Sequence, residues 1–153
     1  MDDQIAMEDV SIAQIMSRDL ITVDVDALGT KVKEIFDTHH IHHIPVLSKG
    51  KELVGIISKL DYHLLLDNFT RFSVPRAEQA NEKFLGAIVA SEIMHDRISV
   101  ISSTDPISEA AAVFVQNIFH CLPVMEGKDL VGIVTTHDLL KYYYDRDKQK
   151  LLN

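Results

Sequence analysis

Two short stretches of the sequence place a hydroxyl and a carboxylate at the same spacing. Each is a heptad with glycine first, serine or threonine fourth and aspartate seventh, at residues 55–61 (GIISKLD) and 132–138 (GIVTTHD). A hydroxyl followed three residues later by an acid is typical of a helix N-terminus, although aspartate is short for the reciprocal bond of a capping box. Alternatively, the carboxylate accepts bonds from two ribose hydroxyls while the serine or threonine and free N–H groups bind phosphate. From the residues alone, both interpretations stay open.

Histidine is the other residue type that gathers in one place, because four of the eight histidines lie within residues 39–43. Such a cluster fits a metal site, a pH sensor or a set of basic groups for an anionic ligand. We expect no metal site, since alternation along a strand points His42 and His43 to opposite faces and no cysteine or histidine spacing matches a zinc pattern. His39 and His40 end a helical pattern, where they are interpreted as partners of the helix dipole or as exposed residues.

The chain contains an internal repeat. Residues 44–61 (IPVLSKGKELVGIISKLD) correspond to 122–138 (LPVMEGKDLVGIVTTHD), and 14–23 (QIMSRDLITV) correspond to 92–100 (EIMHDRISV). Aligned on proline, His42 coincides with His120 and His43 with Cys121. The copies therefore span 10–68 and 88–145, with a linker at 69–87 and a C-terminal tail at 146–153.

Each copy shows the same order of hydrophobic patterns, strand–helix–strand–strand–helix. The first strands are predicted at 20–23 and 98–101, and the last helices begin at residues 58 and 135. The apolar faces of the first helices are expected to carry Val32, Ile35, Phe36 and His39 in one copy, and Ile107, Ala110, Ala111, Phe114 and Ile118 in the other. Asp105 is a candidate helix cap, with Pro106 at the first helical position. We predict an α/β (α+β) fold in which the two copies pack together with pseudo-twofold symmetry, since neither buries enough surface alone.

The linker and tail carry weaker signals. The linker is expected to break at Pro75 and to form a short helix, with Phe69, Phe72 and Phe84 packing inward. The tail is expected to extend the last helix.

Composition excludes several classes of protein. A net charge of −8 disfavours nucleic acid and anionic membranes, both of which need a basic face. The acidic N-terminus lacks the basic and apolar blocks of a signal peptide, and no apolar run approaches the length of a membrane span. A single cysteine permits no intrachain disulfide. We therefore expect a cytoplasmic protein.

With these segments in place, the chain resembles the cystathionine β-synthase (CBS) domain family in its tandem arrangement, the Bateman module. The resemblance rests on the "IM" before the first strand, the apolar-Pro-Val strand and the two heptads, and it covers both copies. It implies a regulatory, non-catalytic module that binds adenosine nucleotides (AMP, ADP or ATP) in clefts between the copies and often forms a homodimer.

The resemblance also implies roles for individual residues. Basic residues two and three positions before the proline touch phosphate in nucleotide-binding members, so His42, His43 and His120 are candidates, and Cys121 is a departure. The heptads contribute Ser58, Asp61, Thr135 and Asp138. The segments that flank adenine correspond to Ile21, Thr22, Ile98 and Ser99. Further cations that could add charge near phosphate are Lys59, His137, Arg18 and Arg97, each of which also fits a solvated surface position.

Three functions compete. The first is an adenosine-nucleotide sensor that modulates its own association or a separate effector protein. The second is a structural dimerisation or docking module without ligand, because capping alone explains both aspartates. The third, an enzyme, lacks a nucleophile–base pair, since Cys121 is placed in a strand beside proline. We expect no enzymatic activity and a homodimer built from amphipathic helices, and the preferred adenylate stays open.

Overall fold

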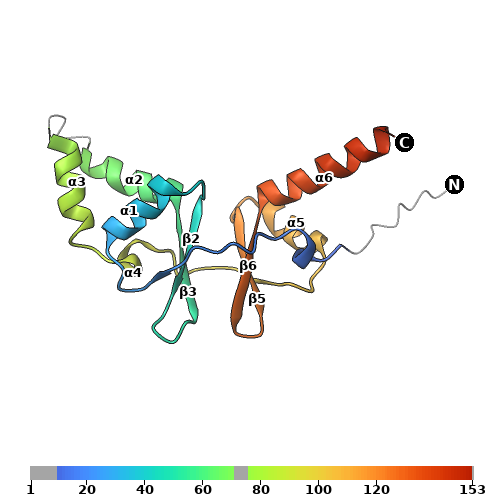
Figure 1. The fold of residues 1–153 in the computed structure, drawn as a ribbon, viewed down its shortest axis with the longest axis horizontal. Coiled ribbons are helices and arrows are strands. Elements are labelled where there is room, and N and C mark those ends of the chain that lie inside the picture. The colour runs from blue at the N-terminus through green and yellow to red at the C-terminus, as the bar shows by residue number, and fades with distance from the viewer. Residues whose placement is uncertain (1–9, 71–75, 153) are drawn as a thin grey trace. The chain divides into compact units, whose positions relative to one another are not determined.

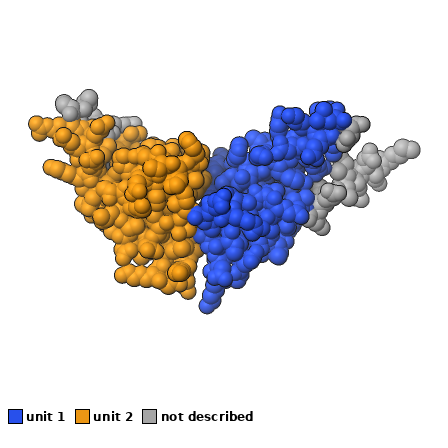
Figure 2. Space-filling model, viewed as in Figure 1, with its two compact units in different colours: residues 1–20, 99–153 blue, residues 21–98 orange. Residues whose placement is uncertain are grey.

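The computed structural model describes residues 10–70 and 76–152, with the backbone alone at 68–70. These residues form two compact units, which Figure 2 colours separately. The continuous unit is Ile21–Ile98, whereas the discontinuous unit combines Met1–Leu20 with Ser99–Asn153. Each unit has its own sheet and its own hydrophobic core.

The continuous unit contains the first sheet. Its elements are β1 (Val23–Asp24), α1 (Gly29–Thr38), β2 (His43–Leu47), β3 (Leu53–Ser58), α2 (Lys59–Thr70), α3 (Ala77–Leu85) and α4 (Ala90–Ile93). Strand β1 is parallel to β2, which is antiparallel to β3. Helix α1 provides the crossover that a parallel pair needs, and it buries Val32, Ile35 and Phe36 as predicted, whereas His39 follows its last residue and is exposed. Figure 1 shows α2 leaving β3 at the end away from the β2–β3 turn.

The discontinuous unit repeats this plan. Its elements are the 3₁₀ turn η1 (Ile12–Gln14), β4 (Ile101–Ser102), α5 (Ile107–Val115), β5 (Cys121–Glu126), β6 (Asp129–Thr135) and α6 (Thr136–Leu151). Strand β4 is parallel to β5, which is antiparallel to β6. The predicted α/β class and element order are thereby confirmed, and the last helix extends through the tail to Leu151.

Each unit takes its leading segment from the other sequence copy. Ser17, at the beginning of the first copy, exchanges two backbone hydrogen bonds with Ile133 of the second, of 2.8 and 3.0 Å. His95, at the beginning of the second copy, exchanges bonds of 2.9 and 3.0 Å with Ile56 of the first. The compact units are therefore not the sequence repeats themselves, because each sheet is completed by a segment that the repeat alignment assigns elsewhere.

The glycines that open the heptads permit this exchange. A Cβ on Gly132 would lie 2.6 Å from Met16 Sδ and 3.0 Å from the Ser17 carbonyl oxygen. A Cβ on Gly55 would meet the Met94 side chain and would lie 2.9 Å from the His95 carbonyl oxygen. The "IM" segment and the heptad glycine are thus two sides of one close packing contact.

The first strand of each copy is shorter and later than predicted. The strands occupy Val23–Asp24 and Ile101–Ser102 instead of 20–23 and 98–101. Pro45 accounts for the limit in the continuous unit. The Leu47 carbonyl accepts from Val25 N–H at 3.0 Å, so alternation turns Pro45 toward β1 as well, and proline has no N–H to lengthen the ladder.

Helix α5 also differs from its prediction at both ends. Asp105 does not cap it but accepts from the Ser102 N–H at 2.9 Å, and Pro106 takes the extended N-cap position instead of the first helical one. The helix ends at Val115 because Asn117 has a left-handed backbone, with φ of 57°. Ile118 therefore leaves the apolar face and is 68% exposed.

The linker forms the expected short helix, α3, and Phe84 is half-buried against the core of the continuous unit. The predicted break at Pro75 and the packing of Phe72 lie outside the described residues, as does the side chain of Phe69.

Candidate functional site

The strand registers gather the candidate residues of the continuous unit at one edge of its sheet. His43, the first residue of β2, pairs with Ser58, the last residue of β3. Because β1 is parallel to β2, the residues that enter β1, including Thr22, approach from this same edge. Helix α2 begins here, so its free N–H groups and positive dipole end lie at this edge too.

The discontinuous unit has an equivalent edge. Cys121 opens β5 and pairs with Thr135, which closes β6, and Ser99 lies shortly before the parallel strand β4. Helix α6 starts at the next residue, Thr136. We call these two places, where β2 begins and β3 ends and where β5 begins and β6 ends, the site edges of the sheets. At both, a hydroxyl residue ends a strand and an aspartate lies three residues further along.

At the site edge of the continuous unit, Asp61 is held through one oxygen. Its Oδ2 accepts from Ser58 Oγ at 2.6 Å, and the Asp61 N–H donates to that hydroxyl at 3.0 Å. His95 Nε2 lies 3.0 Å from the same Oδ2. No residue in the described ranges donates a hydrogen bond to Oδ1, so half of the carboxylate keeps its acceptor capacity.

At the site edge of the discontinuous unit, Asp138 closes a complete capping box. Thr135 donates to Oδ2 from its N–H and its hydroxyl, both at 2.8 Å, and the Asp138 N–H lies 3.3 Å from the Thr135 hydroxyl oxygen. The expectation that aspartate is too short for the reciprocal bond was wrong here. Extended backbone at Thr135, with φ of −122° and ψ of 166°, turns its N–H toward the carboxylate. Oδ1 again has no donor among the described residues.

The histidines before the prolines occupy equivalent positions. The His42 carbonyl accepts from Lys59 N–H at 2.8 Å, and the His120 carbonyl accepts from Thr136 N–H at 3.2 Å. These bonds fix each backbone against a helix start, while both imidazole side chains are exposed. His43 is half-buried at the beginning of β2, and His39 and His40 are exposed at the end of α1. The structure thus brings His42, His43 and His120 to the site edges.

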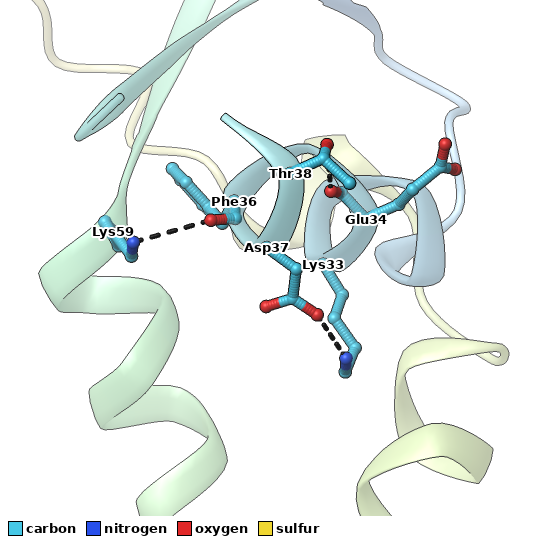
Figure 3. Close-up of polar contacts among 6 residues, drawn as sticks. All are labelled: Lys33, Glu34, Phe36, Asp37, Thr38 and Lys59. Carbon is cyan, nitrogen blue, oxygen red and sulfur yellow. Dashed lines mark hydrogen bonds and ion pairs between the residues drawn. The ribbon is translucent and has the colours of Figure 1, made fainter. Parts of the chain in front are cut away.

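Lys59 is directed toward a different partner (Figure 3). Its Nζ lies 3.4 Å from the carbonyl oxygen of Phe36, in the last turn of α1. The same close-up shows the ion pair between Lys33 and Asp37 along α1. A cation at a helix C-terminus interacts favourably with the dipole, so Lys59 serves α1 in this arrangement.

The remaining candidates contribute less to the site edges. Arg18 donates to the Ala13 carbonyl at 3.1 Å, whereas Arg97 and His137 are exposed. The four residues predicted on the first strands lie before them, in extended segments, and are half-buried: Ile21, Thr22, Ile98 and Ser99. Ile21 also packs against the core of the continuous unit.

Cys121 occupies the position that His43 holds in the other copy, with different chemistry. Burial, together with the negative charge of Asp138, raises the pKa of this thiol to about 12. At neutral pH the side chain is therefore an uncharged, buried thiol, which neither attracts an anion nor acts as a thiolate nucleophile.

His95 is the residue at the site edges that the sequence reasoning missed. In the repeat alignment it coincides with Ser17, so it carried no signal of a shared function. Only the segment exchange brings it beside Asp61, from 34 positions further along the chain by residue number.

In the described part of the chain, no three His, Cys, Asp or Glu side chains come together as a metal site requires. Of the helices at 10–70 and 76–152, none combines the length and apolar character needed for a membrane span.

Comparison with known proteins identifies the family. A model of the CBS domain matches residues 12–63 and 89–145, which together cover most of the chain. The chain belongs to the CBS domain family. The two matched segments confirm the tandem CBS pair inferred from the repeat.

Relatives of known sequence match most of this chain but differ in length. A CBS domain-containing protein from Dictyostelium discoideum is 30% identical over 135 residues, which are 86% of this chain and 89% of the relative. An A-adding tRNA nucleotidyltransferase from Geobacter sulfurreducens is 28% identical over 132 residues. The chain spans only 13% of that enzyme's length.

Solved CBS structures have the same fold. The CBS domain of a CBS domain-containing membrane protein from Sphaerobacter thermophilus has a TM-score of 0.73 and 26% identity, covering 90% of each chain. CBSX2, a protein from Arabidopsis thaliana, was solved in complex with AMP and has a TM-score of 0.70, with 21% identity over 90% of this chain and 98% of that one. A further CBS pair, solved with 5′-methylthioadenosine and S-adenosyl-L-methionine, has a TM-score of 0.68 and 21% identity, covering 90% and 98%.

Proposed function

We propose that this CBS pair is a regulatory module that binds an adenosine nucleotide (AMP, ADP or ATP) at its site edges and has no catalytic activity of its own. One observation carries the proposal. Asp61 and Asp138 each use Oδ2 for the helix start and keep Oδ1 without a donor among the described residues. Capping and ligand binding are therefore compatible at the same carboxylate.

The chemistry around each aspartate suits the parts of an adenylate. A carboxylate oxygen accepts bonds from the ribose hydroxyls, while the imidazoles of His42 and His120 and the positive helix N-terminus suit phosphate. The AMP complex of CBSX2 and the adenosyl compounds bound by another CBS pair support this ligand class, since the folds agree. Cys121 supplies no charge, so we expect the continuous unit to hold phosphate more firmly.

We propose that the module acts through its own association or through a separate effector protein. Helix α6 supports a homodimer because it exposes apolar side chains along its length. Leu140 is 69% exposed, Tyr144 65% and Leu151 87%. Covering such residues is a common reason for association. A monomeric mass in light scattering at about ten times the concentration used for binding would contradict the homodimer.

Calorimetric titration with adenosine, AMP and ATP tests the ligand proposal. Asp138→Ala should weaken binding at the site of the discontinuous unit about ten- to hundredfold, because a charged acceptor is lost there, and should leave the site of the continuous unit able to bind. Asp105→Ala is a matched control, since Asp105 accepts a backbone N–H three residues earlier at 2.9 Å but lies beyond the far end of β4. Both variants should lose about 0.5–2 kcal/mol of stability, and only Asp138→Ala should lose affinity. His42→Ala should weaken AMP more than adenosine, which lacks phosphate.

The complete capping box of Thr135 and Asp138 favours one alternative, a ligand-free docking or dimerisation module. In that case Asp138→Ala and Asp105→Ala would both melt at lower temperature, and both would bind adenylates as the unmodified chain does. A chain that binds none of the three compounds would give the same conclusion.

A further inference from the structure

His95 contacts the carboxylate that the proposed function assigns to the hydroxyls of the ligand. Its Nε2 lies 3.0 Å from Asp61 Oδ2, the oxygen that also accepts from Ser58 Oγ at 2.6 Å. The two groups approach from different parts of the unit, since Ser58 ends β3 and His95 follows α4. Together they restrict the rotation of the Asp61 side chain and leave Oδ1 without a donor among the described residues.

The backbone of His95 is itself fixed in place. Its N–H and carbonyl exchange bonds of 2.9 and 3.0 Å with Ile56, in the middle of β3. Ile56 is buried, and the close contact between Gly55 and Met94 lies directly beside this pair. The imidazole is therefore presented to Asp61 from a backbone position that is bonded to β3, although the side chain itself is 64% exposed.

The equivalent position in the discontinuous unit carries a different residue. Ser17 makes the same paired backbone bonds, with Ile133, and so occupies the same place on its sheet. Within the described part of the chain, however, the hydrogen bonds to the Asp138 carboxylate come from Thr135 alone. The two site edges thus share their backbone but differ in what contacts the aspartate: the N–H and hydroxyl of one threonine at Asp138, and a serine hydroxyl and an imidazole at Asp61.

We propose that His95 is a positioning residue for Asp61, and that its contact raises the affinity of the site of the continuous unit for adenosine compounds. The inference rests on the proposed function. Restricting a side chain before a ligand binds removes an entropic cost that binding would otherwise carry, which corresponds to about two- to tenfold in affinity. Because His95 acts on the hydroxyl-binding carboxylate, its contribution is the same for adenosine and for AMP.

The test uses the full chain carrying Asp138→Ala, which leaves the site of the continuous unit. Adenosine and AMP are titrated into this chain, into the same chain with His95→Ser, which installs the residue of the equivalent position, and into one with His95→Gln. We expect His95→Ser to weaken both compounds by the same factor of about two to ten. The amide donor of His95→Gln should recover part of the loss. Melting temperatures should change little, because an exposed ion pair contributes little stability.

A second comparison separates positioning from a structural role. With Asp61→Ala also present, His95→Ser should have no further effect on affinity, because the group that it positions is gone. A further loss there, an unchanged affinity with Asp61 intact, or a larger loss for AMP than for adenosine would each overturn the inference. If the Asp138→Ala chain, with Asp61 and His95 unchanged, binds neither adenosine nor AMP, the proposed function fails and this inference fails too. If that chain binds both compounds and the added His95→Ser leaves the affinities unchanged, only the proposed role of His95 is wrong.

Discussion

The glycine that opens each heptad is expected to matter for folding before it matters for any ligand. In the continuous unit, Gly55→Ala would force a methyl group against Met94 and the carbonyl oxygen of His95, which would lie 2.9 Å from the new Cβ. Methionine can yield because it is flexible, but the His95 carbonyl cannot move without loosening its bond from Ile56 N–H, of 3.0 Å.

The magnitude follows from these two contacts. Overpacking a well-packed interior costs about 1–3 kcal/mol. Weakening a backbone hydrogen bond adds about 0.5–1.5 kcal/mol, and the lower chain entropy of alanine returns about 0.4–1 kcal/mol. We therefore expect Gly55→Ala to lower the free energy of unfolding by about 2–3 kcal/mol. Gly132→Ala should be slightly milder, since its nearest backbone oxygen, on Ser17, lies at 3.0 Å.

Urea unfolding followed by far-UV circular dichroism measures this effect, as the chain has no tryptophan for fluorescence. Gly50→Ala is the control, because Gly50 lies in the β2–β3 turn and its nearest contact, Ser48 Oγ, is at 3.7 Å. That variant should stay within about 0.5 kcal/mol of the unmodified chain. If Gly55→Ala unfolds at the same urea concentration as Gly50→Ala, the packing argument is refuted, and the glycine would have to be explained by ligand contact.

Two further outcomes follow from the structure. Folding raises the pKa of the Cys121 thiol from 9.0 to about 12, so between these pH values the folded chain keeps a proton that the unfolded chain loses. The buried neutral thiol therefore contributes its full stability below about pH 9. That stability is lost as pH rises toward 12, by at most about 1.4 kcal/mol per pH unit. Urea midpoints at pH 8 and 10.5 should therefore fall less for Cys121→Ala than for the unmodified chain, and equal falls would refute the assignment. Asn117→Ala should cost about 1 kcal/mol because of the φ of 57°, whereas Asn117→Gly should be neutral; equal urea midpoints for these two variants would contradict the strain argument.

Local patterns in the sequence were enough to find the elements and most of the candidate site. The spacing of Val32, Ile35 and Phe36 specified the buried face of α1, since helical periodicity depends only on neighbours along the chain. The hydroxyl–aspartate spacing located the starts of α2 and α6 for the same reason. Repetition then placed His42, His120 and both aspartates in matching positions, and the strand registers gather them at one edge of each sheet.

Errors arose where a contact distant in sequence competed with the local signal. Asp105 and Pro106 have the residue types of a helix start. In the structure, however, the N–H of Ile107 donates to the Val10 carbonyl at 2.9 Å, and the Asp105 carboxylate accepts from Ser102 N–H in the preceding turn. Ile118 fits the period of α5, but the left-handed residue before it ends the helix first.

The segment exchange was decided by tertiary structure alone. No local sequence pattern predicts that Ser17 bonds to the last strand of the second copy, or that His95 lies beside Asp61 in the first. Both contacts join segments that are far apart in the chain. The heptad glycines were visible as a motif, but their reason was not. Glycine is needed there because another segment's methionine and carbonyl already occupy the space of a side chain, and only packing in three dimensions reveals that space to be filled.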